Sequence, residues 1–231
     1  MKKLVFLFLS MFMLGLSGCM DKGDNIEPFP TMPAIVSFDN IIQPVIITPW
    51  GTYYLSGLPN DLMDEDAIWT QFSVNYDQQP PSSKYYVVSD FQYYKVGRNY
   101  PIETAGGMSA NNFDFPLKNV EPIGRVVYDW GDVLFFGFEL TASSDQEFIY
   151  EMTYDPNEID VVYLRAKENS SMGAYPYFYA FDMRYYYTRL PGYSDHIVKF
   201  NIMYQTGVDE EGNDIYKAWD KNPCEIQLKT D

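Results

Sequence analysis

Two acidic stretches contain the residues of this chain that could bind a metal ion. Residues 209–214 carry four carboxylates, but they lack the D-x-[DN]-x-[DN]-G-x5-E order that places ligands around calcium. Residues 61–66 also carry four acids, which could start a short helix because acids are stabilised near its positive end. We therefore predict a solvated hairpin turn and a helix start, with no metal site and no bound cofactor.

Catalysis by a nucleophile would need a base beside an activated serine or cysteine. His196 is the sole histidine, and Asp195 is badly placed to orient it because adjacent strand residues point to opposite faces. No G-x-S-x-G motif is present. Cys224 has no flanking histidine, and Glu225 beside it would raise its pKa, which favours an inert buried thiol. No catalytic residue is predicted, although the 32 acids leave open a distant carboxylate pair, as in glycoside hydrolases.

The tyrosines of residues 175–187 are the best candidates for a binding surface. They put aromatic rings on both faces of a predicted strand, where only one face can meet the core. The outward rings could form a platform for a sugar or another protein, because tyrosine combines an apolar ring face with a polar tip. Ordinary cross-strand pairing of the rings is the alternative. The candidate residues are Tyr175, Tyr177, Tyr179, Tyr185 and Tyr187.

Residues 1–19 have the order of a secretory signal. Lys2 and Lys3 precede an apolar run over residues 4–16, and Leu16-Ser-Gly-Cys19 ends it with two small residues before a cysteine. This order resembles a bacterial lipoprotein signal, which implies cleavage before Cys19 and attachment of lipid to that cysteine. A membrane-spanning anchor is the alternative, but the apolar run is shorter than the roughly 20 residues that a spanning helix needs. The resemblance implies an outer-membrane lipoprotein that contacts the lipid bilayer through Cys19.

The chain is strongly acidic, with a formal net charge of −16 over 231 residues. Loss of residues 1–18 would remove two lysines and no acid, so the remaining 213 residues would be more acidic still. Such a charge repels phosphate groups and anionic lipids, which argues against nucleic-acid binding and against electrostatic attachment to a membrane. Aromatic residues make up 18 % of the chain, with 21 tyrosines, and they favour β-sheet. We therefore expect an all-β protein.

Turn residues and β-rich runs divide the mature chain into three parts. Residues 19–33 contain acids and prolines, which predicts a flexible tether. Residues 34–97 contain five short β-rich runs, which suits a small OB-like barrel. Residues 98–231 begin with an irregular segment and continue with seven or eight strands at a spacing typical of an antiparallel β-sandwich. Within this part, Gly212 and Asn213 suit the tight turn of a hairpin.

A lipoprotein signal ending in Cys19, an acidic tether and two β modules together resemble the NigD-like lipoproteins of the Bacteroides group. The local similarity is greatest in Ala34-Ile-Val-Ser-Phe38, in Pro49-Trp-Gly-Thr-Tyr-Tyr-Leu55 and in residues 85–96. The resemblance implies an OB-like barrel followed by a β-sandwich, with no assigned activity. Acids soon after the lipidated cysteine also resemble a surface-export signal of that group.

These observations together predict a non-catalytic module, lipid-anchored at the outer membrane or cell surface. Its expected role is binding or assembly, through a glycan or a protein partner. An envelope hydrolase with a carboxylate pair and a subunit of a surface fibre are the alternatives.

Overall fold

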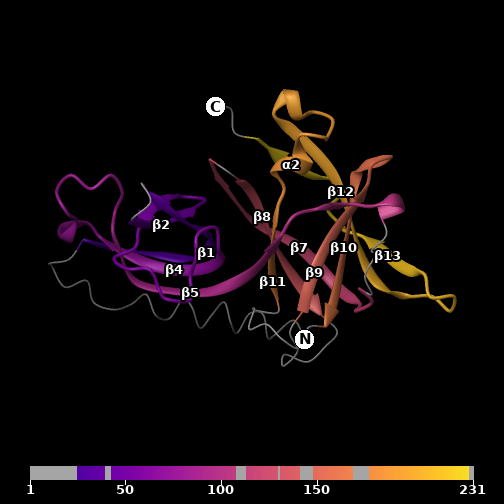
Figure 1. Cartoon of the computed structure of the whole chain (residues 1–231), viewed down its shortest axis with the longest axis horizontal. Coiled ribbons are helices and arrows are strands. Elements are labelled where there is room, and N and C mark those ends of the chain that lie inside the picture. Colours follow the sequence, from indigo (N-terminus) through magenta and orange to yellow (C-terminus); the bar gives the residue numbers. More distant parts are fainter. Residues whose placement is uncertain are drawn as a thin grey trace.

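The protein is built almost entirely from β-strands, arranged in two modules that lie side by side (Figure 1). The computed structural model describes residues 25–39, 43–107, 113–129, 131–140, 148–168 and 177–228. In these residues the strands form two sheets. One has eight strands, in the order β3-β2-β1-β4-β5-β11-β8-β7, and the other has six, in the order β13-β12-β10-β9-β6 with β14 paired to β12. The all-β class is therefore confirmed. No helix of the described part is long and apolar enough to cross a membrane.

The first module is a curled sheet of five strands. They are β1 (Ile26–Asp39), β2 (Gln43–Thr48), β3 (Gly51–Tyr54), β4 (Ala67–Asn75) and β5 (Val88–Asn99). β1 pairs antiparallel with β2 on one edge and with β4 on the other. The side chains on the inner face, such as Ala34, Ile46 and Phe72, form a core of their own. Alternating apolar residues in β4 produce this arrangement because successive side chains of a strand point to opposite faces.

Strand β5 belongs to both modules. Its first part pairs antiparallel with β4, and residues Gly97 to Asn99 pair parallel with β11 (Phe178–Asp182). The sheet continues through β8 (Gly131–Leu140) to β7 (Leu117–Tyr128). The module boundary predicted at Gly97 thus lies inside a continuous strand.

The second module packs β7, β8 and β11 against the second sheet. That sheet contains β6 (Ile102–Glu103), β9 (Phe148–Asp155), β10 (Glu158–Glu168), β12 (Ile197–Val208) and β13 (Asp214–Ala218), with β14 (Cys224–Gln227) paired to β12. Short helical turns are η2 (Tyr76–Gln78), η3 (Ala105–Gly107), α2 (Arg184–Tyr187) and η4 (Tyr193–Asp195). The hairpin predicted around Gly212 is confirmed, because β12 and β13 pair antiparallel and Gly212 has a φ of 84°.

Strand β8 is buried on both faces, and this joins the modules. Leu134 and Phe136 face the core between the two sheets. Val133 and Phe135 face the opposite way and pack with Ile35 of β1 in a separate junction core. A strand covered on both faces needs a continuous apolar run in place of alternation, which explains the sequence Val-Leu-Phe-Phe.

The structure differs from the predicted layout at two places. Residues 26–33, predicted as tether, belong to β1, because Phe29 and Met32 are buried in the first module and the strand pairs with β4 from Ile26 onward. The strand predicted to carry the tyrosines of residues 175–187 ends at Asp182, and α2 follows it. The structure also contains parallel pairs, β5 with β11, β6 with β9 and β10 with β12, among the antiparallel ones.

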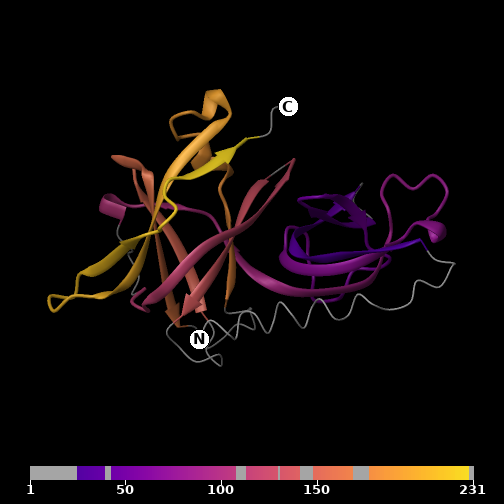
Figure 2. The same ribbon diagram turned by 180° about the vertical axis from the view of Figure 1, so that it is seen from behind.

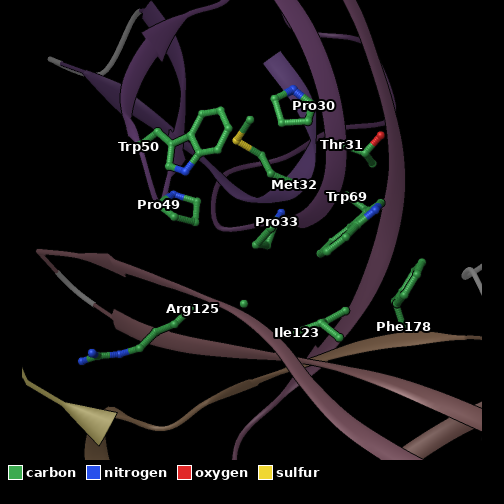
Figure 3. Close-up of a pocket in the computed structure, with 11 residues that line it drawn as sticks. Pro30, Thr31, Met32, Pro33, Pro49, Trp50, Trp69, Ile123, Arg125 and Phe178 are labelled. Atoms are coloured by element: carbon green, nitrogen blue, oxygen red, sulfur yellow. The ribbon is translucent and has the colours of Figure 1, made fainter. Parts of the chain in front are cut away.

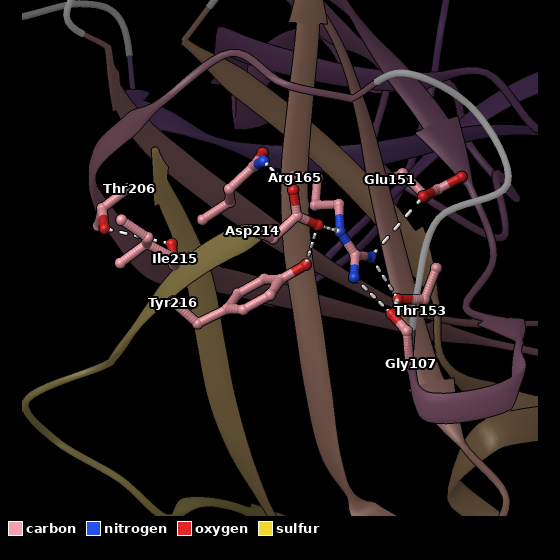
Figure 4. A network of polar contacts seen from close by, with 9 residues as sticks. Gly107, Glu151, Thr153, Arg165, Thr206, Asp214, Ile215 and Tyr216 are labelled. Atoms are coloured by element: carbon pink, nitrogen blue, oxygen red, sulfur yellow. Dashed lines mark hydrogen bonds and ion pairs between the residues drawn. The ribbon is translucent and has the colours of Figure 1, made fainter. Parts of the chain in front are cut away.

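A buried arginine ties the second sheet together (Figure 4). Arg165 of β10 is 1 % exposed and donates a hydrogen bond of 2.6 Å to the Thr153 hydroxyl. Its guanidinium forms ion pairs with Asp214 (3.2 Å) and Glu151 (3.8 Å). It also donates to the Gly107 carbonyl of η3. One side chain therefore connects β9, β10, β13 and η3.

Candidate functional site

The candidate tyrosines do not form one surface. Tyr179 (8 % exposed) and Tyr187 (1 %) lie in the core between the two sheets, so their prediction as outward rings is wrong. Tyr185 is 70 % exposed and Tyr177 is half-buried. Tyr175 lies outside the described residues. The prediction failed because β11 is covered on both faces and because the helical turn of α2 puts the adjacent Tyr186 and Tyr187 into the core.

The acidic stretches serve as turns. Asp209 accepts hydrogen bonds from the backbone N–H groups of Glu211 (3.0 Å) and Asn213 (2.7 Å), which closes the hairpin. In residues 61–66 the carboxylate of Asp66 accepts from the backbone N–H of Met63 (2.8 Å), and the segment forms turns where a helix start was predicted. The described residues hold no group of three or more acids, histidines or cysteines placed to bind a metal ion.

The residues considered for nucleophilic catalysis are a buried cysteine and an exposed histidine. Cys224 is buried, as predicted; burial, and then the carboxylate of Glu121, raise the pKa of its thiol to about 11. Glu121, and not the neighbouring Glu225, is therefore the acid that acts on this thiol. His196 is exposed at the end of η4. Cys19, the predicted site of lipidation, lies outside the described residues.

An open groove of about 480 Å³ lies at the junction of the two modules (Figure 3). β1, β4 and the turn between β2 and β3 supply its residues from the first module, and β7 and β11 supply those from the second. Apolar side chains predominate. The lining consists of Pro30, Thr31, Met32, Pro33, Pro49, Trp50, Trp69, Ile123, Gly124, Arg125 and Phe178.

Aromatic rings from both modules form the sides of this groove. Trp69 of β4 stacks on Phe178 of β11, with ring centroids 4.9 Å apart and an interplanar angle of 19°. In Figure 3, Met32 lies between Trp69 and Trp50, and the Trp50 side chain is 59 % exposed. Its centroid is 5.7 Å from that of Phe29, so one edge of the indole packs on the first module. Large apolar faces are thus held open to solvent.

Close packing and an arginine hold the two sides of the groove in place. Gly124, at a bulge in β7, lies so near β1 that a β-carbon there would be 2.6 Å from Cγ of Pro33. Arg98 of β5 donates to the Glu65 carbonyl of the first module (2.7 Å) and to the Asp182 carboxylate of the second (2.8 Å). With the junction core beneath it, the groove is formed before any ligand arrives.

Few polar groups are available in the groove. The Thr31 hydroxyl donates to the side-chain oxygen of Gln71 (3.2 Å). Within the described part of the chain, the indole N–H groups of Trp50 and Trp69 make no hydrogen bond, so both can donate to a ligand.

Among the described residues of the lining, Arg125 is the one with a charged side chain, and its guanidinium already has partners. Arg125 donates from Nε to Asp132 (2.6 Å) and from Nη1 to the Gln227 carbonyl (2.6 Å), and Figure 3 shows its guanidinium pointing away from the tryptophans. No aspartate or glutamate is among the described residues that line the groove. The arrangement can bind an apolar ligand, and it offers no general acid or base.

Sequence reasoning did not identify the groove. The missing information was the partner of Trp69, because Phe178 is about 110 residues away along the chain and reaches it only through the parallel pairing of β5 with β11. Side-chain periodicity reports which face a residue occupies, and carries no information on which distant strand lies beside it.

Comparison with protein families and with curated proteins finds no match. Solved structures do match. An uncharacterized protein from Parabacteroides merdae has a TM-score of 0.67 at 16 % identity, over 87 % of this chain and 100 % of that chain. A proposed lipoprotein from Bacteroides fragilis has a TM-score of 0.51 at 12 % identity, over 88 % and 99 %. A NigD-like immunity protein from Bacteroides caccae matches with a TM-score of 0.43 at 13 % identity, over 90 % and 100 %. The chain shares its fold with the first two, and its structural neighbours include one protein described as NigD-like.

Proposed function

We propose that this protein is a lipid-anchored, non-catalytic binding module of the outer membrane that holds an extended, apolar segment of a partner protein in the junction groove. The observation that carries the proposal is the preformed groove between Trp50 and the stacked pair of Trp69 and Phe178. Exposed aromatic and apolar surface of this kind, placed in a concave site, is typical of binding sites.

The chemistry of the lining favours a polypeptide over a glycan. A glycan presents many hydroxyl groups, which need hydrogen-bonding partners when they are desolvated. The groove offers mainly proline, methionine and aromatic side chains, with Thr31 and two indole N–H groups as its accessible polar atoms. Proline-containing segments bind aromatic grooves at a small entropic cost, since they are already extended. We therefore infer an extended segment rich in apolar residues or proline.

Binding is favoured over hydrolysis by where the buried carboxylates lie. Asp132 forms an ion pair with Arg125, and Glu151 forms one with Arg165. Neither is part of the groove lining. The described residues that form the groove thus provide no carboxylate pair of the kind that cleaves glycosidic bonds.

The groove is tested by screening the lipidated protein, in detergent, against arrays of proline-containing and apolar peptides. Fluorescence anisotropy of a labelled peptide then gives the Kd, because this readout does not depend on Trp50 and also serves variants that lack it. Replacing Trp50 by Ala should weaken binding by roughly tenfold or more, as expected for an aromatic anchor at the centre of an interface. The matched control is Tyr185→Ala, which removes a ring that is 70 % exposed but lies outside the groove, and it should leave the Kd unchanged.

The same protein is applied to a glycan array. If the protein binds a glycan and Trp50→Ala loses that binding, the ligand of the groove is a sugar and not a peptide. An absence of binding on both arrays, or equal weakening by the two substitutions, would overturn the proposed role of the groove.

The anchor is tested separately. Cys19→Ala should move the protein from the membrane fraction to the soluble fraction, because the thiol that would carry the lipid is gone. Unaltered fractionation would contradict lipidation at this residue and would leave the groove proposal standing.

A further inference from the structure

The start of β1 and the segment that follows β4 form one end of the molecule. Figures 1 and 2 show from opposite sides that this end is the one farthest from the second module. The backbone N–H of Asn25 donates to Asp77 (3.0 Å), and that of Tyr76 donates to the Asn25 carbonyl (2.9 Å). Residues 25–27 and 76–87 are called the terminal face below.

Apolar and aromatic side chains are exposed on the terminal face. Ile26 is 46 % exposed and Tyr86 is 50 % exposed. The rings of Tyr76 and Tyr86 meet edge to face, with centroids 4.9 Å apart, and the Tyr76 hydroxyl donates to the Glu27 carboxylate (2.6 Å). The two tyrosines therefore combine apolar ring surface with a polar tip, as residues at a membrane interface do.

The length of chain before β1 limits how far this face can lie from a lipid. Cys19 precedes Ile26 by seven residues, and an extended chain of that length spans at most about 25 Å. The predicted tether of residues 19–33 would have reached about twice as far, but β1 takes up residues 26–33. Attachment at Cys19 thus holds the terminal face next to the bilayer.

We propose that the terminal face, through Ile26, Tyr76 and Tyr86, docks on the polar–apolar interface of the lipid bilayer to which Cys19 is anchored. The inference rests on the proposed lipidation. Lys84, the cation of this face, forms an ion pair with Asp39 (3.6 Å). Glu27 and Asp77 repel anionic headgroups, so the contact is with zwitterionic lipid and is held by apolar burial. The junction groove lies in the direction of the second module, away from this face, and stays open to a partner.

The test uses the full lipidated protein in phosphatidylcholine vesicles that contain nitroxide-labelled phosphatidylcholine. A fluorophore is attached to Ser83→Cys, an exposed residue of the terminal face that is not one of the three docking residues, under native conditions in which Cys224 is buried. The controls are Met63→Cys and Ile215→Cys, at residues that are 65 % and 47 % exposed. Met63 is in the same module, in the turn whose residues Glu65 and Asp66 form backbone hydrogen bonds with Val36, at the opposite end of β1 from Ile26. Quenching should be several-fold stronger at residue 83 than at either control, and equal quenching at all three would overturn the inference.

A second experiment separates docking from mere tethering. The fluorophore stays at Ser83→Cys, with and without the paired substitutions Ile26→Ser and Tyr86→Ser. Docking by apolar contact predicts that these changes reduce quenching at residue 83, whereas unchanged quenching would contradict it. Vesicle flotation of each sample reports the anchor independently. A protein that does not float shows that lipidation has failed, and one that floats without quenching at residue 83 shows that docking has failed.

Discussion

Among the internal residues, Arg165 is the one whose replacement we expect to lower the stability of the protein most. It is buried with Glu151, and the side chain of Glu151 is 6 % exposed. Replacing Arg165 by Met would leave this carboxylate without a counter-charge in the interior, which should lower the free energy of unfolding by about 3–5 kcal/mol. Urea unfolding followed by circular dichroism measures the change.

An exposed ion pair supplies the control for Arg165. The side chains of Lys199 and Glu225 are 57 % and 55 % exposed, so Lys199→Ala should change the stability by less than about 1 kcal/mol. Adding Glu151→Leu to Arg165→Met should restore part of the loss, because the unpaired charge is then removed. Equal effects of Arg165→Met and Lys199→Ala would show that the buried network is energetically unimportant.

Cys224 should resist thiol reagents in the folded protein. Burial raises the pKa of its thiol to about 11, and only the thiolate reacts. Labelling with a disulfide reagent near pH 8 should therefore be much slower in native protein than in urea. Comparable rates in the two conditions would contradict this.

The raised pKa of Cys224 also has a consequence for stability at high pH. The unfolded thiol ionises first, near its ordinary value of 9.0, so the folded state is fully favoured below that pH. The contribution is lost as the pH rises through 9 toward about 11. A Cys224→Ser variant, which has no thiol to ionise, should show a weaker fall in unfolding temperature over this range.

Among the secondary-structure elements, β5 and β11 are held together by a close approach. A β-carbon at Gly97 would lie 2.2 Å from Cε2 of the buried Tyr179 ring. Gly97→Ala should therefore destabilise the protein by about 1–3 kcal/mol, since the core has to shift to admit the methyl group. Gly57→Ala is the matched control, because nothing lies within 4 Å of a β-carbon there, and thermal unfolding of the two variants should differ clearly. A neutral Gly97→Ala would mean that this contact is loose.

Sequence patterns predicted most strands but not every boundary. Turn residues such as Gly51 and Gly212 separate strands as expected, because they adopt backbone angles that favour glycine. β1 begins earlier than predicted because prolines in residues 28–33 suggested a tether, whereas a proline can lie in a strand at a bulge. The bulge between Phe29 and Met32 provides that place. α2 was missed because a run of three tyrosines favours strand by propensity, and tertiary packing overrides that preference.

For the whole molecule, the shared strand and the junction core predict a single unfolding transition. β5 pairs with strands of both modules, and Ile35 of the first packs with Phe135 of the second. Fluorophores at Met63→Cys and Ile215→Cys report one module each. Their urea midpoints should coincide, as in two-state unfolding, and two separate midpoints would show that the modules unfold independently.

The site could not be predicted at the level of the whole molecule, although the fold class could. Composition and alternation are local properties, and they were sufficient for two β modules. The groove depends on how those modules meet, and that is set by contacts between distant residues such as Pro33 with Gly124 and Trp69 with Phe178. The prediction that Tyr179 faces outward was wrong for the same reason, because distant strands cover both faces of β11.

Strand β1 connects the terminal face to the groove directly. Ile26 lies at the proposed membrane end and Pro33 in the groove lining, seven residues later, which is about 25 Å of extended strand. Tension between the bilayer and a partner held in the groove would run along this one strand. Its hydrogen bonds to β4 lie across the direction of pull, so they are loaded together in shear and resist as a group. The groove is also lined by Ile123 and Phe178 of the second module, so the rest of the load passes into that module through the junction core.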